Sequence, residues 1–299
     1  MSTWSAPRAL TAHEWPALRA AVNRIFRTAE GDLTHDLPLL FDATNTANLR
    51  VIVNDGGAIA AHAAFLQRPA MILGRRTTVG FIGAVFTEPA ARGQRLATKV
   101  LADALAGARA GADLVLASGD RDLYRRQGFE PVPPLARFCL PSVASAATAP
   151  NLLTARALVD GDLPAVAALH DAEPVHFVRS TDDWRKLIGA GRLVDAPATF
   201  TVILRGERVV AFVAAQQARP RPDGTLRPRR ILEVAGDRSA IVALAPLLAD
   251  ELLVPHYDAA TIDQAVALGW VRTARQFPIT AEPLTALARV VPWYGLNYL

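Results

Sequence analysis

The sequence predicts two α/β domains in tandem, because three segments recur in the same order in its two halves. The stretches "PRALTAHEWPALRAAV" and "ARALVDGDLPAVAALH" both change from a strand pattern to a helix pattern. The stretches "VIVNDGGAIAAHAAF" and "VILRGERVVAFVAAQ" both have the pattern of a strand, a tight turn and a second strand. Gly128 and Phe129, at the end of a helix pattern, recur as Gly269 and Trp270. Three matches in one order favour an internal duplication.

Each half has the same predicted order of elements: a strand, helices, a hairpin, a long strand, a helix, a strand, and a final helix and strand. This order is typical of mixed α/β layers. Between the halves, the segment "LPSVASAATAPN" is rich in Ala, Ser and Pro and has no hydrophobic period. We therefore expect a first domain over residues 1–140, a linker over 141–151 and a second domain over 152–299.

Composition narrows the class of protein. The 299 residues are 51% hydrophobic and 20% charged, which suits two globular domains with cores and excludes a disordered or fibrous chain. The formal net charge is +4, and almost all of the basic residues are arginines. Arginine suits phosphate contacts, but an arginine-rich genome explains the excess equally well, so we expect no nucleic-acid partner.

Cysteine use and hydropathy bear on the compartment. The single cysteine, Cys139, excludes an internal disulfide framework and a cysteine-cluster metal site, and we expect no metal. The sequence shows no signal-peptide pattern near its start and no long uncharged apolar run. A cytoplasmic protein without a membrane partner is the expectation.

The stretch "FTEPAARGQRLA", residues 86–97, has the make-up of a phosphate-binding turn. It follows "TTVGFIGAVF", which has the pattern of a buried strand, and it leads into a helix with apolar residues at 96, 100, 101, 104, 105 and 108. A tight basic turn that opens a helix presents unpaired backbone N–H groups at the positive end of the helix dipole. We therefore predict a site for a phosphate or pyrophosphate here.

This turn resembles the signature of the GCN5-related N-acetyltransferases, [QR]-x-x-G-x-[GA], which holds the pyrophosphate of acetyl-coenzyme A. Arg92, Gly93, Leu96 and Ala97 fit its common form R-G-x-G-[IL]-[GA], whereas Arg95 replaces the second glycine. If Arg95 needs a positive φ, it carries a strain of about 1 kcal/mol. We expect instead an ordinary right-handed helical conformation, in which the guanidinium adds a phosphate contact.

A second motif at family spacing supports the resemblance, which covers residues 1–140. After a predicted strand over 112–119, Tyr124, Gly128 and Phe129 match the family's Y-x-x-x-G-F ending. The resemblance implies two domains of this type, each a mixed, mostly antiparallel sheet flanked by helices. It also implies acetyl-coenzyme A as co-substrate, bound through Ala84, Val85, Phe86, Arg92, Gly93, Gln94, Arg95, Leu96, Ala97 and Thr98.

The resemblance also implies catalytic roles. A primary amine of pKa about 10.4 is almost wholly protonated at neutral pH, so a base must serve it. The departing thiolate, of pKa about 8.5, needs an acid, and the resemblance gives that role to Tyr124, which could otherwise be a core aromatic.

The base is less defined than the acid. Glu88 and His35 are candidates, and Asp36 and His62 lie in segments that approach the acceptor cleft in this fold; for each, a solvated or satisfied polar group is the alternative. Tandem acetyltransferases of the enhanced-intracellular-survival type use the chain-terminal carboxylate as base, which adds Leu299.

The second half is expected to be a degenerate copy that walls the acceptor pocket. Tyr124 corresponds to Ala265, and no R-G-x-G sequence follows the second long strand. The insertion "ARPRPDGTLRPRR", residues 218–230, is either a solvated loop or a clamp for an acidic ligand.

We therefore expect an acetyl-coenzyme A dependent N-acyltransferase that acts on a small-molecule primary amine. Transfer to a protein or peptide amine is the rival activity, and an acyl-coenzyme A binding module without turnover is the rival class. A homodimer, common in the family, is left open.

Overall fold

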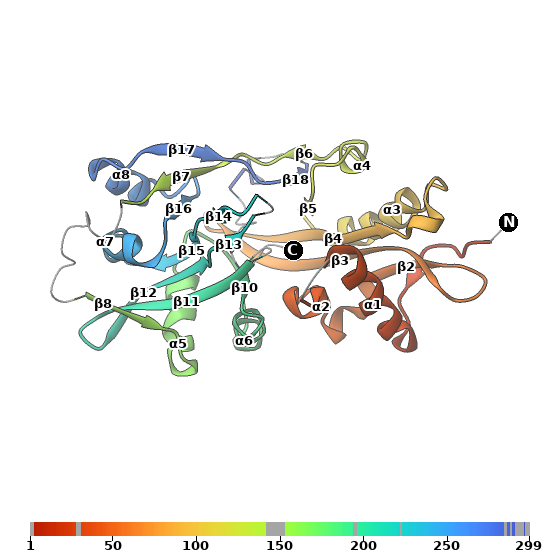
Figure 1. Cartoon of the computed structure of the whole chain (residues 1–299), viewed down its shortest axis with the longest axis horizontal. Helices are drawn as coiled ribbons and strands as arrows, with labels where there is room; N and C mark the ends of the chain where they lie inside the picture. Colours follow the sequence, from red (N-terminus) through yellow and green to blue (C-terminus); the bar gives the residue numbers. More distant parts are fainter. Residues whose placement is uncertain are drawn as a thin grey trace.

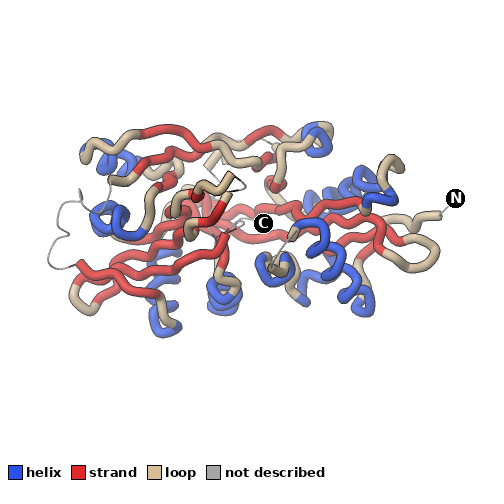
Figure 2. Tube along the Cα trace, in the orientation of Figure 1, coloured by secondary structure: helices blue, strands red, loops and turns tan. Residues whose placement is uncertain are grey.

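The computed structural model describes residues 3–27, 31–141, 153–193, 196–221, 223–283, 286–287, 289–290 and 296. Within these residues the strands form two eight-stranded mixed sheets, each with helices on both faces, as the sequence predicts (Figure 1; Figure 2). Except for Pro141, the expected linker lies outside the described residues. None of the described helices has the length and hydrophobicity needed to cross a membrane.

The first sheet has the strand order β1-β2-β3-β4-β5-β18-β6, and β9 pairs with the far end of β3. Neighbouring strands are antiparallel except β4 and β5. Helices α1 and α2 lie on one face, and α3 and α4 on the other (Figure 1). The elements are β1 Arg8–Ala9, α1 Trp15–Phe26, α2 Leu33–Asp36, β2 Leu49–Val53, β3 Ile59–Ile72, β4 Arg75–Thr87, α3 Leu96–Arg109, β5 Leu114–Ser118, α4 Asp122–Arg125, β6 Glu130–Pro131, β9 Val175–Phe177 and β18 Ile279–Glu282.

The second sheet repeats this plan with the order β10-β11-β12-β15-β16-β7-β17, and β8 pairs with β11. Here β15 and β16 are the parallel pair. Helices α7 and α8 pack on one face and α5 and α6 on the other. The elements are β7 Leu135–Cys139, β8 Leu153–Ala157, α5 Leu163–Asp171, α6 Thr181–Gly189, β10 Arg192–Leu193, β11 Ala196–Arg205, β12 Arg208–Gln216, β13 Arg219–Pro220, β14 Leu226–Arg227, β15 Arg230–Gly236, α7 Arg238–Leu248, β16 Glu251–Val254, α8 Ala259–Ala267 and β17 Arg272–Arg275. The short strands β13 and β14 form a separate hairpin.

The two halves exchange strands. β7 follows β6 in the chain but lies in the second sheet, between β16 and β17. In return, β18 follows β17 but lies in the first sheet, between β5 and β6. The two sheets therefore each contain a strand from the other half of the chain. The expected division into domains at residues 141–151 stays a prediction.

The repeated segments fold alike. Arg8 on β1 pairs with Glu14 at 2.5 Å, and Arg156 on β8 pairs with Asp162 at 2.6 Å, each just before the first long helix of its half. In both halves an arginine on the first strand therefore ties that strand to the start of the helix that follows.

The third repeat also folds alike in both halves. The N–H of Phe129 donates to the carbonyl of Tyr124 at 3.2 Å, and the N–H of Trp270 donates to that of Ala265 at 3.1 Å. Gly128 and Gly269 make these helix endings possible with φ of 90° and 75°, a region that glycine adopts without strain. The correspondence of Tyr124 with Ala265 therefore holds in three dimensions.

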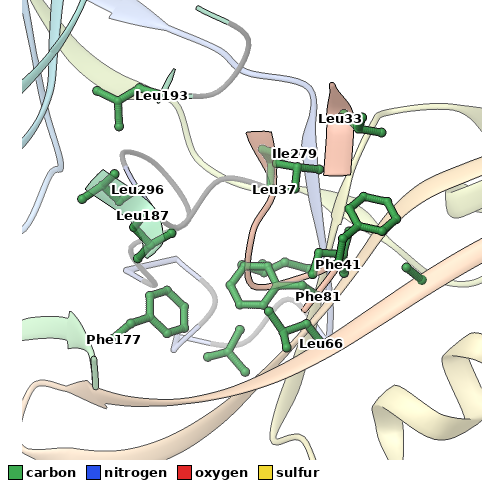
Figure 3. Packing of buried hydrophobic residues seen from close by; sticks show 14 of the residues in the cluster. Leu33, Leu37, Phe41, Leu66, Phe81, Phe177, Leu187, Leu193, Ile279 and Leu296 are labelled. Carbon is green, nitrogen blue, oxygen red and sulfur yellow. The ribbon is translucent and has the colours of Figure 1, made fainter. Parts of the chain in front are cut away.

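One core joins the halves. The six apolar positions expected on the helix after the basic turn are all buried on α3 and pack against the first sheet. On the opposite face, Leu33, Phe41 and Phe81 of the first half lie in one cluster with Phe177 and Leu187 of the second (Figure 3). Because this cluster is continuous, the core on the α1 and α2 side of the first sheet extends into the second half.

Candidate active site

The parallel strands β4 and β5 separate at their carboxyl ends. They pair only where Val79–Ile82 meets Leu114–Ala117; beyond that, β4 continues to Thr87 while β5 ends at Ser118. A bulge bends β4 where its pairing with β3 shifts, and Ala84 there has a φ of 52°. Backbone groups of β4 beyond the bulge are therefore not taken up by β5.

His62 on β3 supports this bulge from behind. Its Nδ1 lies 2.8 Å from the carbonyl oxygen of Ala84. A carbonyl can only accept, so Nδ1 carries the proton. The ring is fully buried between Phe41 and Phe86, and this burial lowers its pKa to about 4. His62 is thus a neutral imidazole that holds the bulge, and its Nε2 has no hydrogen-bond partner among the described residues.

The basic turn opens on a pocket of about 610 Å³, a size suited to a small-molecule site. Of the ten residues expected to bind the co-substrate, seven line it: Val85, Phe86, Arg92, Gly93, Arg95, Leu96 and Ala97. Ala84, Gln94 and Thr98 do not line it; the Gln94 side chain accepts a hydrogen bond from Trp4 instead.

Sequence reasoning missed the other lining residues, of which two lie in the basic turn and four come from segments distant in the chain. They are Ile25, Phe26, Thr87, Ala91, Arg121 and Leu123. Arg121 had one signal in the sequence, its place just before Tyr124. Arg121, Arg92 and Arg95 give the wall three positive charges.

The expectation of a right-handed helical conformation at Arg95 is wrong. Arg95 is the N-cap of α3 and has φ 59° and ψ 23°, the left-handed region. The turn must reverse sharply between Gly93, with φ 81°, and the helix, so the position of the motif's second glycine has a positive φ in this chain. No side chain caps α3. The first N–H groups of any helix have no acceptor within the helix, and here no side chain supplies one; Leu96 and Ala97 of this first turn line the pocket.

Tyr124 lies on α4, next to the pocket but not in its wall. Its side chain is 4% exposed and packs against Phe129 and close to Gly119, where an added Cβ would come within 2.8 Å of the ring. Burial raises the pKa of Tyr124 to about 12. The phenol therefore keeps its proton at every physiological pH.

None of the described candidates for the base lines the pocket. Glu88 forms an ion pair with Arg24, and His35 is an exposed side chain on α2. Asp36 is buried between Arg27 at 2.6 Å and Arg192 at 3.2 Å. Leu299 lies outside the described residues. Within the described wall of the pocket there is no carboxylate or histidine.

The second half fills the corresponding place with its own side chains. β15 and β16 also pair only briefly and then separate, and α7 follows β15 as α3 follows β4. Asp237 caps α7 by accepting from the N–H of Ala240 at 3.1 Å. Glu173, at the end of α5, accepts from the N–H of Gly236 and from Arg238, both at 2.9 Å. The cavity that remains there has only about 30 Å³.

Comparison with known proteins agrees with this geometry. The profile of the family described as "Acetyltransferase (GNAT) domain" matches residues 6–132. A search of curated proteins gives no match.

Solved structures share the fold over nearly the whole chain. A GCN5-related N-acetyltransferase from Anabaena variabilis has 16% identity and a TM-score of 0.68, with 96% of this chain and 74% of that chain covered. One from Kribbella flavida has 15% identity and a TM-score of 0.66, with 94% and 71% covered. The N-myristoyltransferase of Saccharomyces cerevisiae, solved with bound myristoyl-CoA, has 10% identity and a TM-score of 0.54, with 94% and 82% covered.

The family match lies on the half that holds the open turn and Tyr124, and the matching structures extend over both sheets. Residues 6–132 match the acetyltransferase (GNAT) domain family, and the whole chain shares the fold of solved GCN5-related N-acetyltransferases.

Proposed function

We propose that this protein transfers an acetyl group from acetyl-coenzyme A to a primary amine of a small molecule. The observation that carries the proposal is the uncapped N-terminus of α3, which meets the 610 Å³ pocket beside the separated strands β4 and β5. The likeness to an N-myristoyltransferase solved with myristoyl-CoA supports an acyl-coenzyme A as donor.

The residues present fit the pyrophosphate of coenzyme A. Backbone N–H groups at a helix N-terminus favour a phosphate both as donors and through the helix dipole. Arg92 and Arg95 lie on the same wall and can add charge-assisted hydrogen bonds. When bound, the acyl-coenzyme A supplies a thioester carbonyl as the electrophile.

The protein's own groups serve that electrophile in two ways. Backbone groups of β4 beyond the bulge at Ala84 are free of β5 and can orient the thioester. Tyr124, with a pKa of about 12, remains a proton donor for the leaving thiolate.

The described pocket wall offers no base, so we propose that the amine loses its proton through water before attack. The fraction of neutral amine rises about tenfold per pH unit below an amine pKa of about 10.4. The kcat/KM for a simple alkylamine should therefore rise from pH 7 to 9, and ionisation of Tyr124 should not reverse this rise below about pH 11. A plateau near pH 7 would show instead that a protein base acts.

Tyr124→Phe tests the acid role. We expect kcat to fall about 100-fold, because a positioned acid contributes about 10²-fold or more, while the affinity for coenzyme A is kept. Tyr257→Phe, a tyrosine beside the filled site of the second half, is the matched control and should leave kcat unchanged. Thiol release across an amine panel measures kcat, and calorimetry measures coenzyme A affinity.

The outcomes separate the proposed function from its rivals. Unchanged turnover in Tyr124→Phe removes the acid role. Coenzyme A binding without turnover on any amine favours the binding module. Two observations are consistent with that rival: Tyr124 is buried, and the described pocket wall has no base. Turnover on peptides alone favours a peptide amine as acceptor.

A further inference from the structure

Arg121 brings a positive charge to the described pocket from the side of β5. It follows the end of β5 by three residues and is the N-cap of α4. Arg92 and Arg95, the other arginines of the described wall, belong to the turn that follows β4. The pocket therefore has cations on both sides, from the segments that follow its two separating strands.

The guanidinium of Arg121 is available to a ligand. Arg121 is exposed, and none of the ion pairs or side-chain hydrogen bonds found among the described residues includes its guanidinium. Asp122, the acidic residue after it, is paired with Arg125 at 3.3 Å instead, and Asp120 before it does not line the pocket. A guanidinium has five N–H donors and no acceptor, so its partner in the pocket must be an acceptor or an anion.

The strand register places Arg121 level with the end of β4 that lies beyond the bulge. The last pair of the two parallel strands is Ile82 on β4 with Ala117 on β5. Four residues after each member of this pair, the chain reaches Phe86 on β4 and Arg121 after β5, and both line the pocket. Arg121 therefore lies across the pocket from the stretch of β4 that we propose orients the thioester.

Arg121 is also a neighbour of Tyr124. The two residues are three apart at the start of one helical turn, a spacing that puts side chains on the same side. Burial raises the pKa of Tyr124 to about 12, and the positive charge of Arg121 opposes this rise. A phenol with this pKa is a weaker acid than a thiol of pKa about 8.5, so its proton moves to the thiolate against the difference in acidity. A cation beside the sulfur stabilises the thiolate before that proton arrives.

We propose that Arg121 is a catalytic residue whose guanidinium donates a charge-assisted hydrogen bond to the sulfur of coenzyme A as the thiolate leaves. The amine nitrogen forms the C–N bond to the thioester carbon, the C–S bond breaks, and the electron pair of that bond stays on the sulfur beside Arg121. The proton of the amine goes to water, and Tyr124 can protonate the thiolate afterwards. The inference rests on the proposed function, because it concerns the leaving group of that reaction.

The thiol of bound coenzyme A tests the contact without turnover. A thiolate absorbs in the ultraviolet where a thiol does not, so a pH titration of coenzyme A on the full-length protein measures the thiol pKa. Desulfo-coenzyme A, which lacks the sulfur, is the blank and removes the signal of the protein's tyrosines. In the wild type the thiol pKa should fall from about 8.5 to about 7.5 or lower, because a neighbouring arginine favours the thiolate. Arg121→Gln should return it to about 8.5.

Turnover and affinity separate a sulfur contact from a phosphate contact. Arg121→Gln should lower kcat by about 10- to 100-fold, since a hydrogen bond to a charged group is lost, and change the affinity for desulfo-coenzyme A by less than about threefold. Arg121→Lys keeps the positive charge and should recover part of both the kcat and the lowered thiol pKa. Arg126→Gln is the matched control: Arg126 ends α4, is exposed and does not line the pocket, so its replacement should change none of these values.

The outcomes are distinct. A thiol pKa of about 8.5 on the wild type, or an Arg121→Gln variant that weakens coenzyme A and desulfo-coenzyme A equally, overturns the sulfur contact while leaving the acyltransferase intact; the second result gives Arg121 a phosphate as partner. A lowered thiol pKa with no turnover on any amine overturns the proposed function and the catalytic role, and leaves the contact with sulfur. Circular dichroism of each variant shows that it is folded.

Discussion

The N-termini of α3 and α7 occupy equivalent places in the two sheets but present opposite surfaces. At α3 no side chain caps the helix, and its first N–H groups lie at the wall of a 610 Å³ pocket. At α7 Asp237 caps the helix, Glu173 takes the N–H of Gly236, and about 30 Å³ remain. One framework thus gives an uncapped helix start beside an open pocket in one half and a capped, filled helix start in the other.

The difference teaches how such a site is made and lost. A helix N-terminus needs acceptors for its N–H groups, and these come from the protein or from a ligand. An arginine at the N-cap, Arg95, cannot accept a hydrogen bond from them. At α7, Asp237 at the equivalent place and Glu173, which follows α5, accept hydrogen bonds from the backbone N–H groups of Ala240 and Gly236. We therefore expect one coenzyme A per chain.

The largest effect should come from separating the halves. Residues 1–140 alone lack β18, which pairs with both β5 and β6, and lack Phe177 and Ile279 of the shared core. We expect this fragment to be unfolded by circular dichroism and to bind no coenzyme A. Co-expressed fragments 1–141 and 152–299, cut only in the expected linker, are the control and should assemble. A folded, binding fragment 1–140 would show that the exchange is dispensable.

Removing the Glu173 side chain from the N-terminus of α7 should lower the stability of the protein without creating a second site for coenzyme A. In Glu173→Ala, the largely buried Arg238 loses two hydrogen bonds, so the free energy of unfolding should fall by about 3 kcal/mol. Calorimetry should still give one coenzyme A per chain. Asp122→Ala, which removes an exposed ion pair with Arg125, should change stability by less than about 0.5 kcal/mol. Binding of a second coenzyme A in Glu173→Ala would contradict our reading of α7.

Both halves should lose stability in mild acid through a buried neutral histidine. The folded pKa of His62 is about 4, below its ordinary value of about 6.5, so the unfolded chain binds more protons between these pH values. Its contribution is therefore complete above pH 6.5 and is lost as the pH falls toward 4, by about 3 kcal/mol in all. His170 of the second half, with a pKa of about 3, acts in the same direction.

Urea unfolding of His62→Asn at several pH values measures the first of these contributions. The difference in stability between wild type and His62→Asn should shrink by about 3 kcal/mol from pH 7 to 4. A difference for His62→Asn that is independent of pH would mean that His62 is not held neutral.

The smallest effect concerns Arg95 and separates strain from charge. Arg95→Gly should raise stability by about 1 kcal/mol, since glycine adopts the left-handed region freely. It should also weaken coenzyme A binding about tenfold through the lost guanidinium. Arg95→Asn tolerates the same backbone and should weaken binding equally. Tighter binding in Arg95→Gly would mean that strain, not charge, dominates at this position.

Leu73→Gly is the matched control for strain. Leu73 is exposed in the turn between β3 and β4 and has a φ of 50°. Its replacement should raise stability by a similar amount, about 1 kcal/mol, with coenzyme A affinity unchanged.

Several features could be predicted because they depend on short stretches of sequence. The buried face of α3 follows from apolar residues three and four apart, and β4 from a run of apolar and β-branched residues. The match of Tyr124 with Ala265 follows from a glycine and an aromatic residue at the end of each helix. The basic turn and its pocket were located in the same way.

What the sequence by itself determined is the local plan: two similar halves, their elements in order, the basic turn, and the loss of Tyr124's counterpart. Only the tertiary structure decided the left-handed backbone at Arg95, the exchange of β7 and β18 and the use of Glu173 at α7. The reason is physical. Periodicity reports which side of one element is apolar, whereas these features arise between residues far apart in the chain that only packing of both sheets brings together.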